Sequence, residues 1–129
     1  MNKYIDLIKQ TFDFPTKEFK VSGNQLHFNG VNLPEIIETY GTPLKLTYLP
    51  KISENIQNAK TYFGNAMESH EYKGSYTYCY CTKSSHFSFV VDEALKNGVH
   101  IETSSTYDIP IVKSLYEKGK INKETFVVC

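Results

Sequence analysis

The chain has 129 residues, and its 14 lysines are balanced by 14 acidic residues, which gives a formal net charge of zero without any arginine. Neutrality argues against nucleic acid as the main partner and against a polybasic membrane-surface segment, because both need a surplus of positive charge. The sequence contains no continuous apolar run long enough for a membrane span, and its polar N-terminus lacks the apolar core of a signal peptide. With three cysteines, two of them only two residues apart, the composition favours reduced thiols and a cytoplasmic protein.

The first forty residues predict a helix, a hairpin and a second helix. Residues 3–12 place apolar side chains on one helical face. Residues 18–33 read as a hairpin that turns at Gly23-Asn24. Pro34, at a first helical position, predicts a short helix that ends at Gly41.

From residue 42 onward, strands and helices alternate. The predicted strands are 43–49, 75–83, 99–103 and 124–129, and the predicted helices are 51–67, 86–97 and 106–118. Glycines just beyond the second and third of these helices strengthen the pattern, which is typical of βαβ units on a parallel sheet. We therefore expect an α/β fold.

The number of predicted strands leaves two architectures open. A closed (β/α)8 barrel needs about 250 residues, so four strands amount to roughly half of one. The alternative is a small open α/β sheet, whose edges would have to be protected. We favour a partial barrel and expect two parts: residues 1–41 belong to a second, β-rich domain, and residues 42–129 form the first half of the barrel, apparently truncated.

Lys83 is the first candidate for chemistry. Strand alternation places Cys79, Cys81 and Lys83 on one face, with the lysine at the carboxyl tip, where parallel α/β enzymes hold their active sites. A partly desolvated lysine amine there is a nucleophile toward aldehydes. The plainer interpretation is a lysine that ends a strand and points into water.

The next strand and loop add further candidates. Glu102 ends the strand 99–103, where its carboxylate is expected near Lys83 to balance a positive charge. Ser105 and Asp108 precede the helix 106–118, and capping alone explains Asp108 on spacing grounds. His86 reads as a helix-start residue, and the two strand cysteines lack the second pair that a structural zinc site needs, so no metal is expected.

These segments resemble a known family. The N-terminal segment of the fold-type III pyridoxal-phosphate decarboxylases is similar to "LHFNGVNLPEIIETYGTPLKLTYLPKISENI" in this chain. The Tyr-x-x-Lys motif of that family resembles "YCYCTKSS", and its acidic-Ser-acidic block resembles "IETSSTYDI". The resemblance covers residues 25–129 and is strongest to bacterial biosynthetic arginine decarboxylases. The family usually has Lys-Ala/Val-Asn, whereas here Ser84 and Ser85 follow the lysine.

The resemblance implies a function and a set of residues. It assigns pyridoxal 5'-phosphate to Lys83 as its covalent anchor, with the cofactor-binding positions Tyr80, Glu102, Ser105 and Asp108 around it. It implies decarboxylation of L-arginine to agmatine in polyamine biosynthesis, by a homodimer or higher homo-oligomer whose remaining site residues lie beyond residue 129. The chain alone is therefore expected to be inactive.

Other interpretations stay open within and outside the enzyme class. The substrate is alternatively diaminopimelate, ornithine or carboxynorspermidine. A one-domain barrel that carries the cofactor without decarboxylation is a further alternative. Outside catalysis, the chain is alternatively a decarboxylase-like protein that binds the cofactor or regulates partners without turnover.

Overall fold

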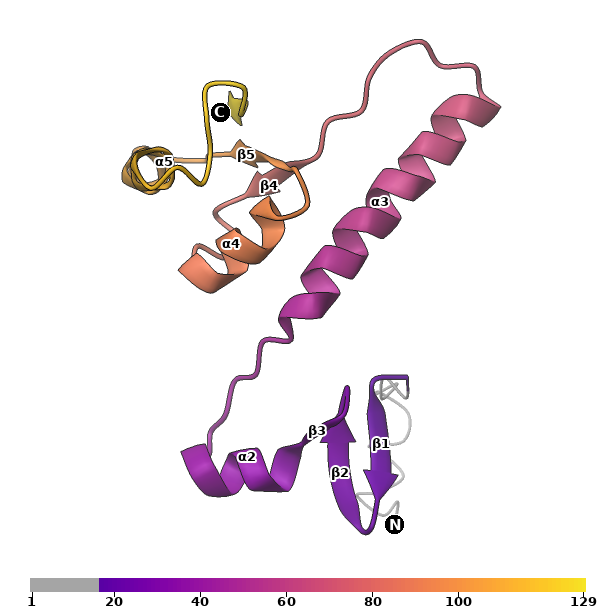
Figure 1. The fold of residues 1–129 in the computed structure, drawn as a ribbon, viewed down its shortest axis with the longest axis vertical. Helices are drawn as coiled ribbons and strands as arrows, with labels where there is room; N and C mark the ends of the chain where they lie inside the picture. Colours follow the sequence, from indigo (N-terminus) through magenta and orange to yellow (C-terminus); the bar gives the residue numbers. More distant parts are fainter. Residues whose placement is uncertain (1–16) are drawn as a thin grey trace, which may run out of the picture. The chain divides into compact units, whose positions relative to one another are not determined.

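The structure is a computed structural model that describes residues 17–129. The helix expected at residues 3–12 lies outside the described residues. The chain divides into two compact units, Met1–Leu46 and Thr47–Cys129, which are described separately (Figure 1). Residues 42–46 therefore group with the first unit, while the assignment of the units to two domains of a larger enzyme stays a prediction.

The first unit contains the predicted hairpin. Strands β1 (Phe19–Ser22) and β2 (Gln25–Phe28) are antiparallel, and Phe19 pairs with Phe28 at 4.9 Å between ring centroids. Gly23 and Asn24 both have positive φ, 56° and 64°, which is the conformation that a two-residue hairpin turn requires. The prediction of the hairpin is confirmed.

Helix α2 follows the short strand β3 (Val31–Asn32), which pairs with β2. The helix spans Leu33–Tyr40, with Pro34 in its first turn. Asn32 caps it by accepting the backbone N–H of Glu35 at 3.5 Å, and Gly41 ends it with a φ of 77°. The predicted bounds of this helix are confirmed.

The second unit holds a parallel sheet of three strands. Helix α3 (Leu49–Ser69) is followed by β4 (Cys79–Cys81), α4 (Ser88–Leu95), β5 (His100–Glu102), a 3-10 turn η1 (Thr106–Asp108), α5 (Ile109–Glu117) and β6 (Val127–Val128). The strands lie side by side in chain order, β4-β5-β6, and both pairs are parallel. This is the βαβ arrangement that the alternation predicts. The closed barrel itself stays a prediction.

One predicted strand is wrong. Residues 43–48 form neither strand nor helix, and α3 begins at Leu49. Apolar alternation alone does not make a strand, because the ladder hydrogen bonds need a neighbouring strand. In the described part of the chain β4 pairs only with β5, and the side chains of Leu44 and Leu46 are exposed.

The core of this unit lies between the sheet and the helices. One cluster joins Val91 of α4, Ile101 of β5 and Leu115 of α5 with Ile121, and a second joins Ile56 of α3 with Ala94 and Val99. Tyr80 packs against both clusters. Strand alternation therefore directs Tyr80 and Ile101 toward the helices and leaves Cys79, Cys81, His100 and Glu102 on the opposite face.

Residues 17–129 contain no helix that combines the length and the apolar character needed to cross a bilayer.

The central strand generates a stability prediction. Ile101 is 1% exposed, so Ile101→Ala should lower the free energy of unfolding by about 2–5 kcal/mol through lost burial and a cavity. The matched control is Ile109→Ala, at a position that is 60% exposed, which should cost less than about 0.5 kcal/mol. Chemical denaturation followed by circular dichroism measures both. Equal costs would show that the β5 side chain is not in the core.

Candidate functional site

A tight turn after β4 carries Lys83. The carbonyl oxygen of Cys81 accepts two hydrogen bonds from Ser84, one from its backbone N–H at 3.2 Å and one from its side-chain hydroxyl at 2.6 Å. Thr82, fully buried, donates both its N–H and its hydroxyl to the carbonyl of Glu102, at 3.1 and 3.2 Å. Lys83 is held between these two anchored residues and projects from the turn. The serine that follows the lysine therefore closes the turn, a role that a short hydroxyl side chain suits.

Tyr80 supports this turn from the core side. Its ring packs against both apolar clusters, and its hydroxyl donates to the carbonyl of Ser85 at 2.8 Å. Burial raises the pKa of the Tyr80 hydroxyl above its ordinary value, so the group acts as a donor at neutral pH. Tyr80 thus fixes the loop between β4 and α4 but does not line the cavity at Lys83.

A cavity of about 490 Å³ opens beyond the carboxyl ends of β4 and β5. Three of the five predicted site residues line it: Lys83, Ser105 and Asp108. Its other walls are His86, Ser104, Tyr107 and Ile111. The carboxyl edge of a parallel sheet is the usual place for a ligand site in α/β proteins. Tyr80 and Glu102, the other two predicted residues, do not line this cavity.

The expected pairing of Glu102 with Lys83 is not formed among residues 17–129. The Glu102 carboxylate accepts the Ser104 hydroxyl at 3.0 Å instead. The register explains the difference, because Glu102 is level with Cys81 and Lys83 lies two residues further along, in the turn. Lys83 is exposed rather than sheltered, so the expectation of a partly desolvated amine is wrong for the described residues.

Asp108 is committed to its own loop. It is 8% exposed, and its Oδ2 accepts the backbone N–H groups of Ser104 and Ser105, each at 2.9 Å, and the Ser105 hydroxyl at 3.2 Å. Ser105 and Asp108 also form a reciprocal capping box at the start of η1. The capping role predicted for Asp108 is confirmed.

These hydrogen bonds change the acidity of Asp108. The pKa of the carboxyl group lies below its ordinary value of 3.8, chiefly because the Ser104 backbone N–H stabilises the charged form. The Ser105 N–H and the Ser105 hydroxyl act in the same direction, while burial opposes them. The ionised carboxylate therefore holds the loop after β5 in place.

Sequence reasoning missed several cavity residues. His86 was expected only at a helix start, and neither Tyr107 nor Ile111 was expected at the site. Tyr107 is 87% exposed and Ile111 belongs to α5. The available signal was their position, because the segments that follow two neighbouring parallel strands converge at one edge of the sheet.

The three cysteines are unpaired, and residues 17–129 contain no group of three side chains placed to bind a metal ion. Comparisons with protein-family models, with curated proteins and with solved structures find no match to this chain.

Asp108 generates a pH prediction. Because its pKa is lowered in the folded chain, ionised Asp108 stabilises the fold above its unfolded pKa, near 3.8, and this stabilisation is lost as pH falls through the lower folded-state value. Asp108→Asn should therefore lower the Tm at pH 7, and the difference from the parent chain should shrink below pH 4. Thermal melts at several pH values measure this.

The control for this experiment is Glu117→Gln, which removes an exposed carboxylate whose ion pair with Lys113 is 3.7 Å long. It should change the Tm little at any pH. A difference for Asp108→Asn that does not depend on pH would contradict the ionised cap.

Proposed function

We propose that this chain is the N-terminal part of a pyridoxal-phosphate-dependent amino-acid decarboxylase that converts L-arginine to agmatine and CO2 in polyamine biosynthesis. The observation that carries the proposal is the position of Lys83. It lines a cavity at the carboxyl edge of a parallel sheet, in the Tyr-x-x-Lys spacing of the resembled family. The strand order β4-β5-β6, which follows the chain, is also the order that a (β/α)8 barrel has.

The accessibility of Lys83 supports the proposal of an aldehyde cofactor. Among the described residues, the Lys83 ammonium forms no ion pair or hydrogen bond, and the cavity of about 490 Å³ gives it access to a ligand. Lys83 would hold the cofactor covalently, with Ser104 and Tyr107 beside it. Pyridoxal phosphate, when bound, supplies the electron sink that lets an α-carboxylate leave as CO2.

The chain's own residues have two supporting roles in this proposal. Tyr80 holds the turn that carries Lys83, through its hydrogen bond to the Ser85 carbonyl. Asp108 fixes the backbone of Ser104 and Ser105, which form the opposite wall. Tyr80 and Asp108 are therefore positioning residues, because their polar groups are already bound to the protein. Glu102 has a similar supporting role, because its carboxylate accepts a hydrogen bond from the hydroxyl of Ser104, which lines the cavity.

Selective labelling tests the anchor. Incubation with pyridoxal phosphate followed by borohydride should attach the cofactor to Lys83 more than to any other of the 14 lysines. The near-violet absorbance of the bound cofactor should disappear in Lys83→Ala. Absorbance spectra and peptide mapping measure both. Lys113→Ala removes another exposed lysine, from α5, and serves as the control. Labelling spread evenly over exposed lysines would contradict the assignment.

Turnover tests the reaction and the substrate. A full-length gene product that contains this chain should release agmatine and CO2 from L-arginine faster than it decarboxylates ornithine, diaminopimelate or carboxynorspermidine. Lys83→Ala should reduce the rate by at least about 10³-fold, since it removes the covalent nucleophile. The 129-residue chain alone should give no turnover above background. A full-length Lys83→Ala variant that retained the parent rate would overturn the proposal.

A further inference from the structure

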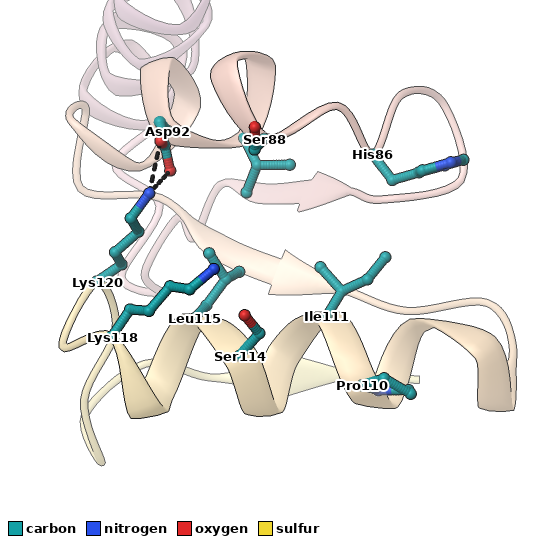
Figure 2. Close-up of a pocket in the computed structure, with 10 residues that line it drawn as sticks. His86, Ser88, Asp92, Pro110, Ile111, Ser114, Leu115, Lys118 and Lys120 are labelled. Atoms are coloured by element: carbon teal, nitrogen blue, oxygen red, sulfur yellow. Dashed lines mark hydrogen bonds and ion pairs between the residues drawn. The ribbon is translucent and has the colours of Figure 1, made fainter.

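A second cavity lies in the groove between α4 and α5, on the helix side of the sheet (Figure 2). Its volume is about 270 Å³, slightly below the range of about 300–1,000 Å³ that is usual for small-molecule sites. It shares His86 and Ile111 with the Lys83 cavity but contains none of the residues to which the proposed function assigns chemistry. We call it the α4–α5 groove.

The floor of the α4–α5 groove is apolar. Val91 and Leu115 are 2% and 7% exposed and belong to the main core cluster, and Ile111 packs against that cluster. Because Val91 and Leu115 are already almost fully buried, the half-buried Ile111 supplies most of the apolar surface that a ligand in the groove could cover. An apolar group placed on it would gain roughly 25 cal/mol for each Å² removed from water.

One end of the groove carries excess positive charge. Lys120 donates to both carboxylate oxygens of Asp92, each at 2.6 Å, and this ion pair connects the segment after α5 to α4. Lys118 also lines the groove, and its ammonium forms no ion pair or hydrogen bond within the described residues. Figure 2 shows both lysine side chains entering from the same end. Two lysines against one aspartate leave one positive charge without a partner.

A polar group lies next to this charge. Ser114 of α5 lines the groove four residues before Lys118, the residue that follows the end of α5, and the Ser114 hydroxyl has no hydrogen-bond partner in the described part of the second unit. An ammonium and a hydroxyl at i and i+4 spacing share a helix face, so one small acceptor can reach both. A carboxylate offers two acceptor oxygens for such a pair.

We propose that the α4–α5 groove binds a small organic carboxylate with an apolar body. The carboxylate lies at Lys118 and Ser114, and the apolar body lies on Val91, Ile111 and Leu115. An inorganic anion would leave the half-buried Ile111 side chain in water, and a neutral apolar molecule would leave the Lys118 charge unpaired. This site does not depend on the function proposed for Lys83.

The test uses three probes that share one phenyl ring: phenylacetate, 2-phenylethanol and phenethylamine. Methyl-resolved NMR titrations of the chain follow Val91, Ile111 and Leu115. Phenylacetate should shift these signals saturably and bind more tightly than the neutral probe, while the cationic probe should bind most weakly. Added salt should weaken phenylacetate binding, because the charge at the groove is partly exposed.

Two matched lysine variants locate the charge. Lys118→Gln should weaken phenylacetate binding by about fivefold and leave 2-phenylethanol unchanged, because only the charge-assisted hydrogen bond is lost. Lys113→Gln lies on the same helix outside the groove and should leave both affinities unchanged. Unchanged methyl spectra in the absence of probe establish that both variants fold.

Three outcomes would overturn the proposal. These are an absence of saturable shifts at the groove methyls, equal binding of phenethylamine and phenylacetate, and equal phenylacetate affinities for Lys118→Gln and the parent chain. None of these readouts involves pyridoxal phosphate. Failure of the groove proposal therefore does not affect the proposal for Lys83, and failure of the Lys83 proposal does not affect the groove proposal.

Discussion

The parallel pairing of β4 with β5 is the interaction on which the rest of the second unit depends. Its register places Cys81 beside Glu102, and buried Thr82 extends the pairing with two hydrogen bonds to the Glu102 carbonyl. Both strands end at this point. The two loops that follow therefore begin at the same edge of the sheet, where they enclose one cavity.

Each of those loops is then fixed by a different polar group. The Tyr80 hydroxyl holds the loop after β4 through the Ser85 carbonyl, and the Asp108 carboxylate holds the loop after β5 through two backbone N–H groups. Tyr80 is half-buried and Asp108 is buried, and each side chain forms hydrogen bonds to the backbone of its own loop. The side chains of Tyr80 and Asp108, which form hydrogen bonds to backbone groups, therefore position the site. Neighbouring residues are left to contact the ligand.

The sequence predicted much of the local structure. The hairpin follows from Gly23-Asn24, the bounds of α2 from Pro34 and Gly41, and the cap of the turn before α5 from Asp108. These features depend on residues within a few positions of one another. For that reason their signals are legible in a single sequence.

The features that sequence reasoning missed depend on residues far apart in the chain. Residues 43–48 alternate like a strand, yet they pair with no strand of the described residues, and alternation within a segment does not reveal whether such a pairing forms. The separation of Lys83 from Glu102 follows from the register of two strands and from the turn that Ser84 closes. The α4–α5 groove is formed by two helices about twenty residues apart, so no motif could indicate it.

Amide hydrogen exchange at the ends of β4 and β5 tests this account most directly. The N–H groups of Thr82 and Thr103 donate to carbonyls of neighbouring strands, at 3.1 and 2.8 Å, and both residues are buried. Their amides should exchange among the slowest in the chain and far more slowly than that of Lys45, in the segment without secondary structure. If Thr82 exchanged as fast as Lys45, β4 and β5 would not be paired in this register, and the cavity at Lys83 would not form; fast exchange of Thr103 alone would contradict only the pairing of β5 with β6.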